Sequence, residues 1–114
     1  MKFMLLMTDV EGDWDRLAAV EQEQIMQRHT AVQRELEAQG KFVTTHRLRP
    51  GREGKTVRLL GDGKLVVTDG PFVETKESVG GYYIVDCAGM DEALECAKRL
   101  RFMPGCIEVR AVWE

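Results

Sequence analysis

Apolar residues along the chain fall into short continuous runs that are typical of buried strands. Residues 3–8 and 81–85 place apolar side chains on both faces, where a strand with one wet face would alternate. Such runs predict strands that are covered on both sides. Four more runs predict further strands, and the middle two form a hairpin around a Gly-Asp-Gly-Lys turn: residues 42–48, 56–60, 65–68 and 107–112.

Two other segments carry apolar residues at the spacing of a helix. The first helix is predicted over residues 21–39, and Gly40 lies where helices commonly end on a glycine. The second helix is predicted from a cap at Gly89 or Asp91 to Arg101.

The order of these elements predicts the fold class. With the hairpin counted as an insertion and residues 9–15 as a connection, the order is strand, helix, strand, strand, helix, strand. This is the βαββαβ order of a ferredoxin-like α+β domain. No linker or repeat divides the sequence, so residues 1–114 are predicted to form one domain.

One face of the predicted sheet needs a cover, because two helices can cover only the other face. Met4, Leu6, Tyr82 and Ile84 alternate with Phe3, Leu5, Tyr83 and Val85, so both faces of the sheet are apolar. We therefore predict a homodimer in which two sheets pack face to face. The alternative is a monomer in which the inserted hairpin or the C-terminal tail folds over this face.

Composition narrows the classes of partner and compartment. The chain has 114 residues, of which 44% are hydrophobic and 31% charged, as in ordinary globular domains. A net charge of −3 with dispersed basic residues argues against nucleic-acid binding. The 3 cysteines lack Cys-x-x-Cys spacing, and no apolar run approaches the length of a membrane span. We expect a cytoplasmic protein that uses no membrane, metal or cofactor.

His29 is the strongest single candidate for chemistry. Ile25, His29, Val32 and Leu36 fall within a narrow arc on the inward side of the first helix. A histidine there must find a hydrogen-bond partner or shift toward its neutral form. Asp69 ends a strand just before a turn, a position suited to a carboxylate at the mouth of a cleft. The alternative is a structural histidine that a structural carboxylate satisfies.

One stretch of sequence carries more than turn chemistry. Asp-Gly-Pro-Phe at residues 69–72 is followed by Glu-Thr-Lys-Glu at 74–77 and by Gly-Gly-Tyr-Tyr at 80–83. With this combination the chain resembles, over essentially its whole length, the DGPF group of the YCII-related family. The resemblance implies a dimeric α+β barrel. It also matches His29 and Asp69 to a histidine–aspartate pair that has been proposed as an active site in YCII-like domains.

Five further residues are predicted to contact a ligand: Lys76, Glu77, Tyr82, Tyr83 and Arg110. Lys76 and Glu77 match the family motif and would form a charged rim that orients a polar substrate. Tyr82 and Tyr83 point to opposite faces of their strand, so one packs under a helix and the other faces the dimer cavity. Arg110 faces the same cavity if its neighbours in the last strand meet the helices. The alternatives are a solvated loop for the charged pair and an intrastrand ion pair for Arg110.

Two classes of function follow from the resemblance. One is a cofactor-independent isomerase or lyase acting on a small aromatic or lactone-like molecule, with His29 as general base and Asp69 as its orienting carboxylate. The other is a non-catalytic regulatory or ligand-sensing module associated with extracytoplasmic-function sigma factor systems. A third possibility is a dimeric scaffold, which a cavity filled by Tyr and Met side chains would favour.

Overall fold

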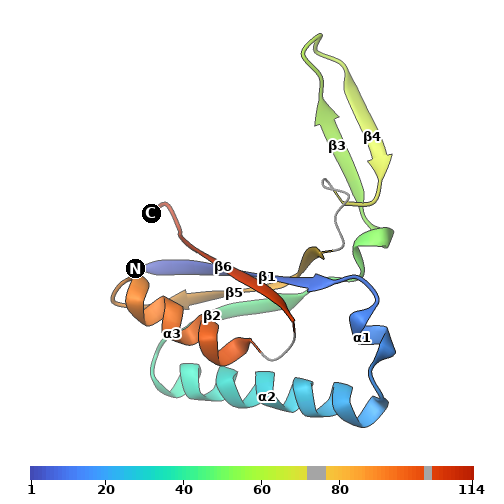
Figure 1. Cartoon of the computed structure of the whole chain (residues 1–114). Helices are drawn as coiled ribbons and strands as arrows, with labels where there is room; N and C mark the ends of the chain where they lie inside the picture. The colour runs from blue at the N-terminus through green and yellow to red at the C-terminus, as the bar shows by residue number, and fades with distance from the viewer. Residues whose placement is uncertain (72–76, 102–103) are drawn as a thin grey trace.

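The computed structural model describes residues 1–71, 77–101 and 104–114. Its main sheet has four strands: β1 (Lys2–Val10), β2 (Phe42–Arg47), β5 (Glu77–Asp86) and β6 (Gly105–Ala111). Two long helices accompany it: α2 (Ala19–Ala38) and α3 (Met90–Leu100). The remaining elements are the short helix α1 (Asp13–Arg16), the 3₁₀ turn η1 (Gly51–Glu53), and a separate hairpin of β3 (Lys55–Leu59) and β4 (Leu65–Asp69) (Figure 1).

The strands of the main sheet lie in the order β2-β5-β1-β6, and every neighbouring pair is antiparallel. The strand that follows each helix lies at an edge of the sheet, and the two strands that precede the helices lie in the middle. A ferredoxin-like domain with split βαβ units has this arrangement. The predicted α+β fold with an inserted hairpin is therefore confirmed.

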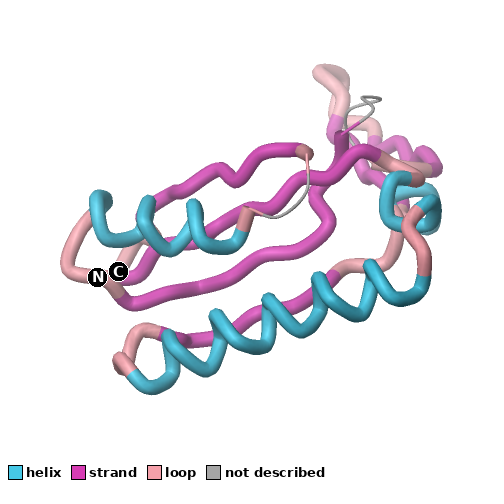
Figure 2. Tube along the Cα trace, turned by 60° about the horizontal axis from the view of Figure 1, so that its bottom comes forward, coloured by secondary structure: helices cyan, strands magenta, loops and turns pink. Residues whose placement is uncertain are grey.

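The core lies between the sheet and the two long helices, which cover the same face (Figure 2). Phe3 and Leu5 of β1, Leu36 of α2 and Leu100 of α3 are almost completely buried. Burial of each such side chain contributes roughly 1.5–3 kcal/mol of transfer free energy. These contacts fix the face that α2 turns toward the sheet, and that face includes His29.

The predicted end of the first helix is confirmed in detail. Gly40 has a φ of +70°, a left-handed conformation that favours glycine. Its N–H donates to the carbonyl of Glu37 at 3.0 Å, and the N–H of Lys41 donates to the carbonyl of Leu36 at 2.8 Å. These two bonds satisfy carbonyls that the helix leaves without partners. Neither α2 nor another helix in the described ranges is long and apolar enough to span a membrane.

The second face of the main sheet, here called the uncovered face, carries half-exposed apolar side chains. Met4, Leu6, Tyr82 and Ile84 alternate with the buried residues of the helix-covered face. Trp113 in the C-terminal tail is 100% exposed, so its side chain does not cover them. Within the described residues, the chain buries these strands on one side only.

The β3–β4 hairpin projects away from the main sheet, on the side opposite to the helices (Figure 1). Val57, Leu59, Leu65 and Val67 form one face of the hairpin, and each of these side chains is 61–72% exposed. The radius of gyration is 16.0 Å, against about 13 Å for a compact domain of this length. The hairpin is thus an arm with an unburied apolar side, and it does not fold over the uncovered face.

Candidate functional site

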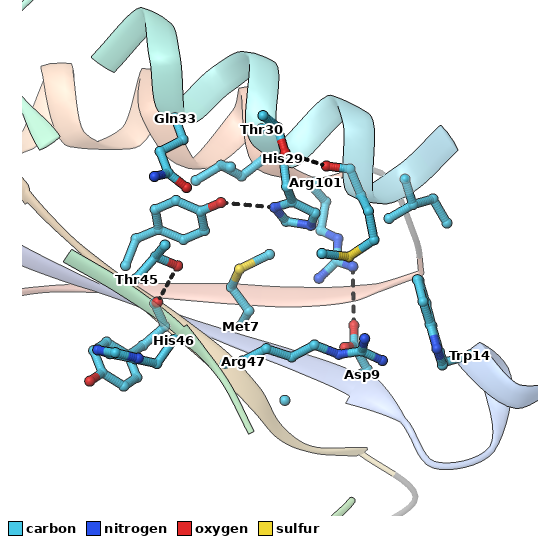
Figure 3. A pocket seen from close by; sticks show the side chains of 17 residues that line it. Met7, Asp9, Trp14, His29, Thr30, Gln33, Thr45, His46, Arg47 and Arg101 are labelled. Atoms are coloured by element: carbon cyan, nitrogen blue, oxygen red, sulfur yellow. Dashed lines mark hydrogen bonds and ion pairs between the residues drawn. The ribbon is translucent and has the colours of Figure 1, made fainter. Parts of the chain in front are cut away.

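A cavity of about 250 Å³ lies between α2 and the sheet, next to α1 (Figure 3). Liquid water of this volume amounts to on the order of eight molecules, so the space suits a small metabolite. Polar side chains converge on it from separate parts of the chain: His29 of α2, Tyr83 of β5, Asp9 of β1, Arg47 of β2 and Arg101 after α3.

A hydrogen-bonded pair lies in this cavity. His29 Nδ1 and the Tyr83 hydroxyl are 3.0 Å apart, and the two rings are nearly parallel, with 16° between their planes. His29 faces the sheet because it shares the inward stripe of α2 with buried Val32 and Leu36. Tyr83 alternates with Val85 on the helix-covered face of β5. Helix and strand periodicity together therefore bring the two side chains into contact.

The surroundings keep this pair uncharged near neutral pH. Burial is the main cause that lowers the pKa of His29 below its ordinary value of 6.5. The carboxylate of Asp9 opposes that shift, whereas Arg101 and Arg47 add to it. Burial likewise raises the pKa of Tyr83 above 10.0. A neutral imidazole is the form that can accept a proton.

Asp9 is the carboxylate of this cavity. Its Oδ1 lies 3.3 Å from Nη2 of Arg101, in a partly buried ion pair. Arg101 Nη1 also donates to the backbone carbonyls of Thr8 at 3.2 Å and Cys106 at 3.4 Å. The guanidinium thereby links the end of β1 to β6 and fixes the carboxylate. In the described ranges, no group of three or more His, Cys, Asp or Glu side chains could hold a metal ion.

Two consecutive glycines in β5 make room for this arrangement. A Cβ at Gly80 would lie 2.7 Å from Oδ2 of Asp9, and a Cβ at Gly81 would lie 2.9 Å from the backbone carbonyl of His46. The pairing of β1 with β5 also shifts register opposite Gly80, as at a β-bulge. The Gly-Gly that precedes the tyrosines therefore has a steric reason: it admits the Asp9 carboxylate and the close approach of β2.

The side chain of Trp14 borders the same cavity from α1. The guanidinium carbon of Arg47 lies 4.3 Å from the centre of its ring, a cation–π contact. The predicted connection at residues 9–15 contains most of the short helix α1, which carries Trp14. The indole limits the cavity on the side of β2.

The structure does not bring Asp69 to His29 within one chain. Asp69 is the last residue of β4 in the projecting arm; its side chain is 86% exposed and lies 2.6 Å from Nζ of Lys55. It does not border the cavity, where Asp9 supplies the carboxylate. The reason is that β4, which ends at Asp69, pairs with β3 in the hairpin and is not part of the main sheet. A His29–Asp69 pair stays a prediction that would need a second copy of the chain.

The predicted charged rim is described only in part. Lys76 lies outside the described residues. Glu77 is the first residue of β5, where it pairs with Val10 of β1. Its side chain is exposed and does not border the cavity.

The remaining predicted residues divide between the two faces of the sheet. Both tyrosines border the cavity, but it is Tyr83 that packs beneath α2. Tyr82 pairs with His46 across β5 and β2, and their ring centres are 5.7 Å apart. Arg110 lies on the uncovered face, because its neighbours in β6 pack against the core. Within the described residues no ion pair joins it to Glu108.

Sequence reasoning missed Asp9, Arg47 and Arg101 as members of the site. Each lies at the end of an element or beyond it, where periodicity assigns no face. The one usable signal was the pair of glycines at 80–81, since a glycine inside a strand often marks a bulge or a close approach.

The fold and the cavity together define a class: a ferredoxin-like α+β domain with a pocket of polar and apolar side chains beneath its first long helix. Within this class the chain belongs to the YCII-related family, whose domain model matches residues 1–114. It is 44% identical over 80 residues to an uncharacterised protein of Rhizobium meliloti (strain 1021). That match takes in 70% of this chain and 64% of the relative, so the chain spans a little under two thirds of that protein's length.

Proposed function

We propose that this protein binds a small organic molecule in the cavity beneath α2 and acts on it as a cofactor-independent isomerase or lyase. The observation that supports the proposal is the partly buried His29–Tyr83 pair, in which the His29 pKa is lowered. A neutral imidazole near a carboxylate that is held in place suits proton abstraction at neutral pH.

The residues divide the chemistry among them. Neutral His29 takes a proton from a carbon of the substrate, and Tyr83 holds the orientation of the imidazole through Nδ1. Asp9 favours the imidazolium that forms, because its charge raises the pKa of His29. The proton then returns to a different carbon in an isomerisation, or a leaving group departs with the bonding electrons in an elimination.

We further propose a homodimer formed through the uncovered face. Half-exposed apolar residues on the sheet and the apolar side of the hairpin arm support it, because large unpartnered apolar patches mark interaction sites. In such a dimer the predicted ligand contacts that do not border the cavity of one chain would come from the interface: Asp69, Glu77 and Arg110.

A second candidate function is a non-catalytic ligand sensor associated with extracytoplasmic-function sigma factor systems. The projecting hairpin supports it, since its exposed apolar side could bind a protein partner instead of a second copy (Figure 1). Both candidates use the cavity as a ligand site. They differ in whether His29 is needed for turnover or only for binding.

The test is a screen of small metabolites by two-dimensional ¹H–¹⁵N NMR, followed by assays for turnover of each hit. We expect hits to shift the resonances of residues that border the cavity, and His29→Gln to abolish turnover while the fold is retained. The comparison variant is His46→Gln, which removes the other of the 2 histidines; His46 also borders the cavity, but its ring lies against Tyr82 and not against Tyr83. Full turnover in His29→Gln would refute the catalytic role, and hits that bind without turnover would favour the sensor.

A further inference from the structure

We infer that the cavity selects a small organic carboxylate with a flat apolar body, and that Arg47 binds the carboxylate group. This inference rests on the proposed ligand site and specifies its ligand class.

The charges around the cavity do not balance. Asp9 and Arg101 neutralise each other in their ion pair, and Arg101 is further held by backbone carbonyls. The uncharged His29–Tyr83 pair adds no charge. Arg47 then contributes a positive charge that no described carboxylate pairs with. A ligand with one negative charge would restore neutrality.

Arg47 is prepared to bind such a ligand. Its guanidinium rests against the face of Trp14, with 4.3 Å from the guanidinium carbon to the ring centre. This contact restrains a flexible side chain and leaves the edge of the guanidinium available for in-plane hydrogen bonds. Two parallel N–H···O bonds to a carboxylate are the usual use of that edge. A doubly charged phosphate would need further cations, and Arg101 is already engaged by Asp9.

The remainder of the cavity favours an apolar body. Four aliphatic and thioether side chains border it beside the indole of Trp14: Met7, Ile25, Met26 and Leu100. Figure 3 shows Arg47 and Trp14 at one side of the cavity and His29 at the other. A ligand whose carboxylate lies at Arg47 would therefore extend its body toward the imidazole. The volume of about 250 Å³ is below the 300–1,000 Å³ range of sites for drug-sized ligands, which restricts the body to roughly one ring.

Matched probes test the inference. Benzoate and benzamide have the same ring and differ in charge, as do cyclohexanecarboxylate and cyclohexanecarboxamide, which lack the flat ring. Each is titrated into the ¹⁵N-labelled protein, and the shifts of cavity residues give its dissociation constant. We expect benzoate to bind at least about tenfold more tightly than benzamide, since bonds to a charged group are worth about 1.5–3 kcal/mol. We also expect it to bind more tightly than cyclohexanecarboxylate.

Two variants assign the preference to one side chain. Arg47→Gln should reduce the preference for carboxylate over amide to about twofold or less, while the amide binds as before. Arg49→Gln is the control, because Arg49 pairs with Glu53 and does not border this cavity. Equal losses in both variants would overturn the role of Arg47.

The outcomes distinguish a failure of carboxylate selection from a failure of the proposed ligand site. If benzoate and benzamide shift cavity resonances with equal affinity, carboxylate selection is wrong and the ligand site stands. If cyclohexanecarboxylate binds as tightly as benzoate, the flat body is wrong. If no probe from the matched pairs or the metabolite screen shifts a cavity resonance, the ligand site and the inference are both overturned.

Discussion

His29 is placed so that its protonation should affect folding as well as chemistry. Its pKa is lowered in the folded state, chiefly by burial. The unfolded chain therefore binds this proton more tightly than the folded chain, and the free energy of unfolding should fall as the pH drops below about 6.5. The stabilising contribution of neutral His29 is fully present above that pH.

The lowered pKa of His29 predicts how the stability of two variants depends on pH. Between about pH 7.5 and about pH 5.5, wild type should lose more free energy of unfolding than His29→Gln, because the variant has no imidazole to protonate. Urea unfolding at several pH values measures the difference, and an NMR titration of the histidine C2 protons gives the pKa directly. His46→Gln should retain the wild-type loss, since it leaves the His29–Tyr83 pair intact. Equal losses in wild type and His29→Gln would count against a lowered pKa.

At the level of elements, the site depends on how closely β1 and β2 approach β5. Gly80→Ala would place a methyl group 2.7 Å from Oδ2 of Asp9. The carboxylate must then move, which weakens its ion pair with Arg101. Neither Gly80 nor Gly61 has a left-handed backbone. Substitution by alanine therefore tests the contacts of the added methyl group without left-handed backbone strain.

We expect Gly80→Ala to cost about 1–3 kcal/mol of stability and to shift the resonances of Arg101 and His29. Gly61→Ala, in the hairpin turn with no atom near its added methyl group, should stay within about 0.5 kcal/mol of wild type. Urea unfolding and ¹H–¹⁵N spectra of both variants check this. A Gly80→Ala protein with wild-type stability and an unchanged Arg101 signal would show that Asp9 moves without consequence.

The elements were largely predictable from the sequence, whereas the site was predictable only in part. Helical periodicity predicts that Ile25, His29, Val32 and Leu36 share one side of the helix. In the structure these residues face the sheet, as predicted. Asp9 and Arg101 meet across 92 residues at the ends of a strand and a helix, and no local pattern encodes such a contact. The position of Asp69 depended on which sheet its strand joins, and tertiary packing decides that.

For the molecule as a whole, the open question is what the uncovered face and the hairpin arm contact. Burying apolar side chains is the main driving force for association, so the proposed homodimer should depend on that face. Light scattering should give twice the chain mass of 12.9 kDa for wild type. Ile84→Glu places a charge on the uncovered face and should give the mass of one chain, whereas Val20→Glu, on exposed α2 surface, should not. A wild-type protein with the mass of one chain would refute the homodimer.

A comparison of the dimer with the single chain also tests whether Asp69 reaches His29 of another copy. A carboxylate near an imidazole raises its pKa, so Asp69→Asn should lower the His29 pKa if the two groups meet across a dimer. The substitution should then have no effect in the Ile84→Glu background, because one chain keeps Asp69 on the arm, beside Lys55. The NMR titration of His29 in four proteins measures this coupling: wild type, Asp69→Asn, Ile84→Glu and the double variant. If the titration is unchanged in all four, Asp9 is the carboxylate that acts on His29, and the histidine–aspartate pair of this protein lies within one chain.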